Sequence, residues 1–92
     1  MVTIRGMVFG DRGEKVWNAT VVFRPVRGGE GYPRFGLTDG EGAFEVRDIA
    51  PGDYTVVVTQ RFYTVHTFPM HVTGGDYIEI FLVPDRANRR TY

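Results

Sequence analysis

The feature that most constrains the fold is a pair of tight-turn signals, each placed beside short runs of alternating apolar and polar residues. The dipeptide Asp39-Gly40 precedes the run 43–47, and Pro51-Gly52 separates that run from residues 54–60. Glycine tolerates the positive φ that tight turns need, Asp can bond its own backbone, and Pro presets φ. This segment therefore predicts antiparallel strands joined by short turns.

The same alternation runs through most of the chain and predicts seven strands. They are expected over residues 2–9, 18–24, 34–38, 43–47, 54–60, 62–73 and 77–83. Pro69 has no amide hydrogen for a ladder, so the 62–73 strand is expected to be interrupted or bent there, at a sheet edge or a bulge. Seven short strands with no helical period predict an all-β, seven-stranded Greek-key sandwich.

Every second residue of a strand shares one face, which predicts the core. The residues expected to be buried together are Phe44, Val46, Tyr54, Val56, Val58, Ile78, Ile80 and Leu82. The inward residues of the first two strands are Val2, Ile4, Gly6, Val8, Ala19, Val21 and Phe23.

Length and charge limit the number of domains and the kinds of partner. The 92 residues suffice for one domain, assigned to residues 1–84, with a polar, Arg-rich tail over residues 85–92. With 11 basic and 11 acidic residues, the chain lacks the basic excess expected for binding nucleic acid. No apolar run approaches the roughly 20 residues of a membrane span. Cysteine is absent, which excludes disulfides and thiolate zinc sites.

Spaced residues along the chain carry a resemblance to a known family. They are Ile4-x-Gly6-x-Val8, Gly13, Ala19-x-Val21, Thr38-Asp39-x-x-Gly42-x-Phe44 and Pro51-Gly52-x-Tyr54-x-Val56-x-Val58. In order and spacing they resemble the carboxypeptidase regulatory-like domain over residues 2–83. The resemblance implies a transthyretin-like (prealbumin-like) sandwich of seven strands. The chain departs from the pattern at residues 16–18, where such domains usually carry a Pro-x-Gly-like turn.

The sequence offers little for catalysis or metal binding. It contains no serine and no cysteine, so a conventional Ser or Cys nucleophile is excluded. His66 and His71 are five residues apart, which places them on opposite faces of a regular strand, where they cannot easily share a metal. A break in the strand phase at Pro69 would keep a shared site open. We therefore expect no catalytic, cofactor or metal site. The loop acids are expected to form turns, with calcium binding where two loops converge as the alternative; they are Asp11, Asp39, Glu41, Asp48, Asp53 and Asp76.

Six apolar residues fall at positions opposite the predicted core. They are Met7, Phe9, Val22, Val57, Phe81 and Val83. Scattered apolar residues are normal on a surface, but six on four strands exceed what a free monomer needs. Two explanations stay open: the predicted strand phases are wrong, or a sheet face packs on another domain, a second copy or the tail. The second predicts a protein interface and weak self-association.

Four aromatic residues are expected near loops, namely Trp17, Tyr32, Phe62 and Tyr63. Aromatic rings bind sugars by stacking, so together they would form a glycan platform. The other interpretation is that they cap the ends of the core.

These observations favour a non-catalytic accessory module that spaces or docks neighbouring domains or another protein chain. We expect it in a secreted or cell-envelope protein as part of a longer chain, or in the cytoplasm if the chain is complete. The alternative is a carbohydrate-binding module using the loop aromatics. A third hypothesis is a small enzyme or metal protein built around His66 and His71.

Overall fold

The computed structural model describes residues 1–26 and 32–85, which form seven strands and no helix. The predicted tail therefore lies outside the described residues from Arg86 onward. Each strand lies within two residues of its expected bounds. The strands are β1 (Val2–Gly10), β2 (Thr20–Pro25), β3 (Arg34–Leu37), β4 (Ala43–Ile49), β5 (Gly52–Gln60), β6 (Tyr63–Val72) and β7 (Asp76–Leu82).

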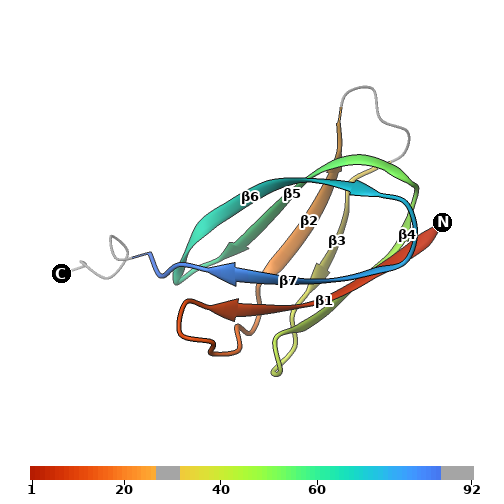
Figure 1. Ribbon diagram of the computed structural model, residues 1–92. Helices are drawn as coiled ribbons and strands as arrows, with labels where there is room; N and C mark the ends of the chain where they lie inside the picture. The colour runs from red at the N-terminus through yellow and green to blue at the C-terminus, as the bar shows by residue number, and fades with distance from the viewer. Residues whose placement is uncertain (27–31, 86–92) are drawn as a thin grey trace.

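The strands form two sheets, which confirms the predicted all-β sandwich. One has three strands in the order β4-β1-β7, and the other has four in the order β3-β2-β5-β6. All pairs are antiparallel except β1 and β7, the first and last strands, which run parallel. The N-terminus and the segment after β7 therefore lie at opposite ends of the molecule (Figure 1).

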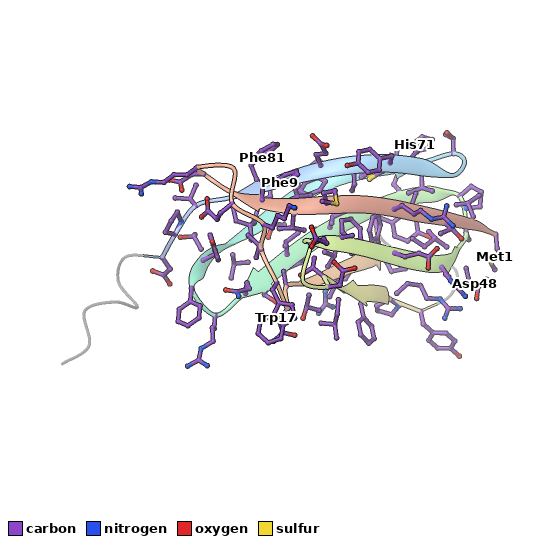
Figure 2. All side chains as sticks on the ribbon, turned by 90° about the horizontal axis from the view of Figure 1, so that it is seen from below. Met1, Phe9, Trp17, Asp48, His71 and Phe81 are labelled. Carbon is purple, nitrogen blue, oxygen red and sulfur yellow. The ribbon has the colours of Figure 1, made fainter. Side chains whose placement is uncertain are left out.

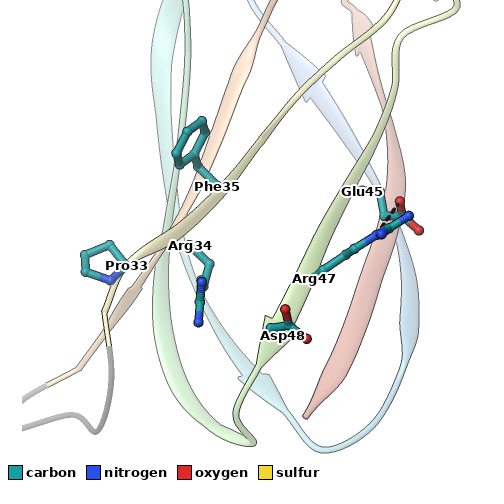
Figure 3. Close-up of a pocket in the computed structure, with 6 residues that line it drawn as sticks. All are labelled: Pro33, Arg34, Phe35, Glu45, Arg47 and Asp48. Atoms are coloured by element: carbon teal, nitrogen blue, oxygen red, sulfur yellow. Dashed lines mark hydrogen bonds and ion pairs between the residues drawn. The ribbon is translucent and has the colours of Figure 1, made fainter.

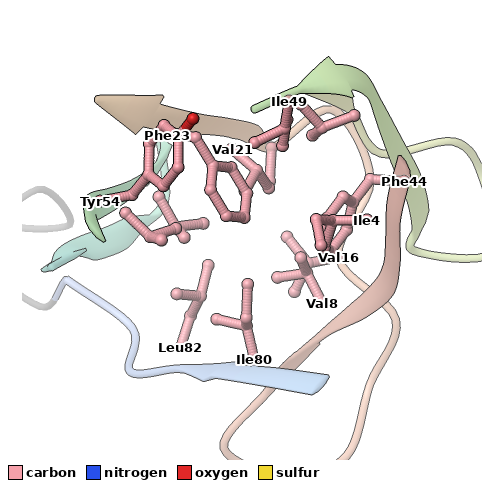
Figure 4. Packing of buried hydrophobic residues seen from close by; sticks show 14 of the residues in the cluster. Ile4, Val8, Val16, Val21, Phe23, Phe44, Ile49, Tyr54, Ile80 and Leu82 are labelled. Carbon is pink, nitrogen blue, oxygen red and sulfur yellow. The ribbon is translucent and has the colours of Figure 1, made fainter. Parts of the chain in front are cut away.

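The core lies between the two sheets and is filled by the inward residues of the alternating pattern (Figure 4). Seven of the eight predicted core residues are buried, and Ile78 is the exception because it is half-buried and packs at the margin of the cluster. The rings of Phe23 and Tyr54 meet edge to face at 5.9 Å between centroids. The Tyr54 hydroxyl also donates a hydrogen bond of 2.6 Å to the carbonyl of Ala50.

Gly6 of β1 allows the aromatic ring of Phe44 to lie directly on the backbone. A Cβ at this position would stand 2.6 Å from Phe44 Cζ and 2.3 Å from the carbonyl oxygen of Ile78. Both distances are far inside van der Waals contact. Glycine is therefore required at this position by the close approach of both neighbours.

The turn after Asp39 differs in detail from the expected Asp-Gly hairpin. The positive φ, 79°, belongs to Gly42 rather than to Gly40. The amide of Gly42 bonds the carbonyl of Asp39, and the Asp39 carboxylate accepts from the amides of Glu41 and Ala43. The loop is long enough for a turn followed by one left-handed residue, a common alternative to the two-residue hairpin. These amide bonds, first that of Ala43, hold the pKa of Asp39 below its usual value.

Strand β6 is continuous through Pro69, so the predicted interruption at this proline is wrong. Pro69 stands opposite Thr55, and the only register shift between β5 and β6 lies beyond Val58. The other half of the expectation is confirmed because β6 is an edge strand. An edge strand accepts proline where its missing amide hydrogen faces away from the sheet.

Candidate interaction surfaces

All six outward apolar residues lie outside the core, so the predicted strand phases are correct. They do not share one face, however. Met7, Phe9 and Phe81 belong to the three-stranded sheet, with Val83 just beyond it, whereas Val22 and Val57 belong to the four-stranded sheet. Alternation decides whether a side chain points inward or outward, but not which of two sheets carries its strand. The six positions are therefore divided between two opposite faces, and either face carries only some of them.

On the three-stranded sheet, Phe9 and Phe81 form a stacked pair. They are partners across β1 and β7, and their ring centroids are 5.3 Å apart with an interplanar angle of 26°. Phe81 remains 56% exposed, whereas Phe9 is half-buried. Figure 2 shows the pair on the side of the sandwich opposite Trp17. Stacked rings of this kind retain a large apolar surface for a partner.

On the four-stranded sheet, a row of partners crosses all four strands. Phe35 of β3 stands beside Val22 of β2, then Val57 of β5 and Thr67 of β6. We call these four residues the apolar row. It contains no charged side chain, and Phe35 at its edge is 64% exposed. The surface continues on the same side to Leu37, which stands opposite Thr20.

Phe35 and Leu37 are not among the outward residues predicted from the sequence, although the sequence carries a signal for them. They alternate with Gly36, and glycine inside a strand often marks a close approach of another backbone. A Cβ at Gly36 would lie 2.5 Å from the carbonyl oxygen of Glu45. Gly36 therefore faces inward against β4, which turns both of its neighbours outward.

The four aromatic residues of the predicted glycan platform are not brought together. The carbonyl of Trp17 accepts a bond of 3.0 Å from Gln60 Nε2, so Trp17 and Phe62 lie near the same end of the sandwich. Tyr32 precedes β3 at the opposite end, because β3 begins beside Phe23. Tyr63 packs against the core. Of the four, Trp17 and Phe62 are thus the two that this end exposes most, at 63% and 57%.

The two histidines lie on opposite faces of β6, as their spacing predicts. His66 pairs with Val58 and His71 with Asp53, with no register shift between these pairs. His66 packs its ring 5.3 Å from that of Phe68, and His71 Nδ1 lies 2.5 Å from the Asp53 carboxylate. Within residues 1–26 and 32–85, no three His, Asp or Glu side chains are grouped closely enough to hold a metal ion.

A groove between β3 and β4 is lined by residues of both signs of charge (Figure 3). The Glu45 carboxylate bridges two arginines, at 2.9 Å from Arg5 and 3.1 Å from Arg47. The rest of the lining consists of Pro33, Arg34, Phe35 and Asp48. Charged side chains along these two strand edges disfavour pairing with other chains. The two arginines and two acidic residues that line the groove leave no excess charge for an ionic ligand.

A polar contact closes the end of the sandwich near Phe62. The Tyr63 hydroxyl donates to Glu14 Oε2 at 3.0 Å, and the amide of Arg12 donates to Glu14 Oε1 at 3.0 Å. Bonds from its own backbone amide and from the Tyr63 hydroxyl hold the pKa of Glu14 below its usual value. Burial and the neighbouring Glu14 raise the pKa of Tyr63. Both groups are therefore used to fasten the β1–β2 loop to β6.

The motif residues noted in the sequence belong to the strands and turns of a two-sheet sandwich with the expected core. The sequence profile of the carboxypeptidase regulatory-like domain matches residues 3–81. The chain belongs to this family. No curated protein matches this regulatory-like domain in sequence.

Solved structures share the fold of this regulatory-like domain at low sequence identity. A chain of a type II cohesin-X-dockerin complex from Acetivibrio cellulolyticus is 23% identical, with a TM-score of 0.70 over 91% of this chain and 58% of that one. A DUF3823 family protein from Parabacteroides merdae is 11% identical, with a TM-score of 0.69 over 90% of this chain and 46% of that one. Catechol 1,2-dioxygenase from Pseudomonas arvilla C-1 is 13% identical, with a TM-score of 0.74 over 92% and 52%. The regulatory-like domain thus spans about half of each of these chains.

Proposed function

We propose that this regulatory-like domain is a non-catalytic accessory module that docks a neighbouring domain or another protein chain. The observation that carries the proposal is the pair of uncharged apolar patches on its two outer faces. One is the Phe9–Phe81 stack, and the other is the apolar row with Leu37 beside it. The inward positions are already filled, so these side chains are not needed for the domain's own core.

The energy available from these patches suits a docking surface rather than a permanent dimer. Burial of apolar area contributes about 25 cal/mol per Å². A weak to standard interface removes roughly 400–800 Å² per partner from water. The gross gain is several kcal/mol, and much of it offsets the loss of translational and rotational freedom. Tethering to a partner in one longer chain would reduce that entropic cost.

Light scattering over a concentration series tests the docking proposal. The wild-type chain should self-associate weakly, and Phe81→Glu or Phe35→Glu should reduce this association because a charge is placed in an apolar patch. Thr73→Glu is the matched control, since Thr73 is exposed and lies outside both patches. A wild-type chain that stays monomeric at the highest concentration, or a Thr73→Glu effect as large as that of Phe81→Glu, would contradict self-docking through these faces.

A carbohydrate-binding module is the second candidate, favoured by the exposure of Trp17 and Phe62 near one end. A polysaccharide pull-down separates it from the first. Carbohydrate binding predicts retention of the wild-type chain and its loss on Trp17→Ala, with Tyr32→Ala at the other end as the control. The docking proposal predicts no retention of any of the three proteins.

The proposed location is a secreted or cell-envelope protein in which this domain is one part. An accessory role beside other domains supports it. Across the described residues, no helix is long and apolar enough to cross a membrane.

A further inference from the structure

The first and last strands form one continuous parallel ladder. Seven residues of β1, Ile4 to Gly10, stand opposite seven of β7, Asp76 to Leu82, without a register shift. The two strands point the same way in Figure 1. The start of β1 and the end of β7 therefore lie at opposite ends of the ladder.

We propose that this ladder is a shear clamp, which lets the domain bear tension applied between the segment before β1 and the segment after β7. The proposal concerns the backbone of the three-stranded sheet and does not depend on docking at the outer faces. The ladder would resist mechanical tension transmitted along the chain, and no ligand is involved.

The parallel arrangement determines how such a load would act. Tension along the chain pulls β1 toward its own start and β7 toward its own end, so the two strands are drawn past each other. The ladder hydrogen bonds lie across the strands, and the bonds of a parallel pair are evenly spaced. They therefore share the load and must break nearly together. A pull that separates both strands at one end would instead break the bonds one after another.

Packing on both sides of the ladder opposes sliding. β1 is the central strand of its sheet and is also paired with β4, so it cannot leave without breaking a second ladder. On the inner side, Val8 and Ile80 are partners, and both are buried in the core. On the outer side, Phe9 and Phe81 stack across the same two strands. Sliding by one residue would place the outward residues of one strand beside inward residues of the other.

The end of β7 is fastened independently to the other sheet. The amide of Thr64 donates to the carbonyl of Val83 at 2.8 Å, and the amide of Asp85 donates to the carbonyl of Phe62 at 3.0 Å. Tyr63 and Pro84 form a bridge between these two bonds. A load arriving from beyond Asp85 thus meets β6 before it reaches the ladder.

Single-molecule force spectroscopy on the full 92-residue chain tests the clamp directly. The chain has no native cysteine, so two introduced cysteines define where force is applied. Thr3→Cys with Val83→Cys loads the ladder in shear. Thr3→Cys with Gly74→Cys attaches both handles at one end and peels the same ladder open. A Cβ at Gly74 meets no heavy atom within 4 Å, so the control substitution fits the fold.

The rupture force should be several-fold higher in the shear geometry than in the peeling geometry at the same loading rate. Urea unfolding of both double variants should give the same midpoint, which shows that direction rather than stability causes the difference. Equal rupture forces in the two geometries would overturn the proposal.

A second comparison tests whether the β1–β7 contact itself resists the load. In the shear geometry, Phe81→Ala should lower the rupture force because it removes the stack across the ladder. Val57→Ala on the other sheet is the control and should leave the rupture force unchanged. If both variants lower the rupture force equally, resistance to the pulling force lies outside the ladder and the clamp proposal is overturned. Docking would be unaffected by this result, because the molecules are pulled one at a time.

Discussion

Thr38 links β3 to the loop before β2 through two hydrogen bonds of its side chain. Its side chain is buried between β3 and the loop before β2, where Oγ1 accepts from the amide of Ala19 at 2.8 Å and donates to the carbonyl of Val16 at 2.7 Å. Backbone bonds between the same segments flank this pair. One hydroxyl thus satisfies two buried groups that no regular ladder reaches.

Replacement of Thr38 tests this arrangement. Thr38→Val keeps the shape but leaves a buried amide and a buried carbonyl unpaired, and should lower the free energy of unfolding by about 2–3 kcal/mol. Thr38→Ser keeps the hydroxyl and should lose only about 1 kcal/mol, for one buried methyl group. Urea unfolding with an unchanged slope measures both. Equal stability of the two variants would show that the hydroxyl contributes nothing.

Asn18 explains the departure from the family pattern at residues 16–18. Its φ is 61°, in the left-handed region that favours glycine and, next, asparagine. Asn18 therefore supplies a left-handed residue within the stretch where the family pattern usually carries a Pro-x-Gly-like turn.

The backbone conformation predicts different effects for two small substitutions at Asn18. Asn18→Ala should lower the free energy of unfolding by about 1 kcal/mol, because a Cβ without a local polar group is disfavoured at this φ. Asn18→Gly should match the wild type within about 0.5 kcal/mol, since glycine accepts the conformation but has more freedom when unfolded. Thermal and urea unfolding measure the order. Greater stability of the alanine variant than of the glycine variant would refute the argument.

At the scale of elements, strand β1 depends on one glycine where three strands meet. Gly6→Ala would push a Cβ against the carbonyl oxygen of Ile78, which belongs to a paired strand and cannot move aside cheaply. We expect a loss of about 1–3 kcal/mol in the free energy of unfolding. Gly40→Ala is the matched control, because no heavy atom lies within 4 Å of its Cβ and its φ is not positive.

The free energy of unfolding of Gly40→Ala should stay within about 1 kcal/mol of the wild-type value. Alanine restricts the unfolded chain, which favours a slight increase. The urea unfolding midpoints of Gly6→Ala and Gly40→Ala measure this difference in stability. If Gly6→Ala costs no more than Gly40→Ala, then the close contact of β1 with Phe44 and β7 is not tight in solution.

For the whole molecule, the pH dependence of stability follows from groups whose pKa values differ between the folded and unfolded states. The pKa values of Glu14 and Asp39 are lowered by hydrogen bonds to their carboxylates. A lowered folded pKa means that the carboxylate stabilises the fold above its unfolded pKa, and that this contribution is lost as the pH falls through the folded pKa. Stability should therefore decrease on the acid side of their ordinary values of 4.5 and 3.8.

The free energy of unfolding in urea, measured from about pH 2 to pH 7, tests this expectation. The double variant Glu14→Gln with Asp39→Asn should lose less stability with falling pH than the wild type, because neither amide titrates. On the alkaline side, stability should decrease as the pH rises. The pKa of Tyr63 is raised, so its contribution is present below its unfolded pKa and lost as the pH rises through the folded value. If the double variant loses as much stability at acid pH as the wild type, that loss must come from other carboxylates.

The sequence by itself determined the strands, their inward faces, the positions of the turns and the family of this chain. These follow from local rules, because side chains alternate along a strand and because glycine, proline and aspartate have strong turn preferences. Those rules placed Phe44 and Val56 in the core and Phe81 outside it, and they separated His66 from His71.

Only the tertiary structure decided which strands are neighbours. Alternation contains no information about which sheet a strand joins, so it did not reveal that Val22 and Phe81 lie on opposite faces. Nor did it reveal that β1 pairs in parallel with β7, a contact between residues more than 70 positions apart. Pairing over such a distance is selected by the packing of the whole core. It is this pairing that separates the two ends of the domain and creates the proposed load-bearing ladder.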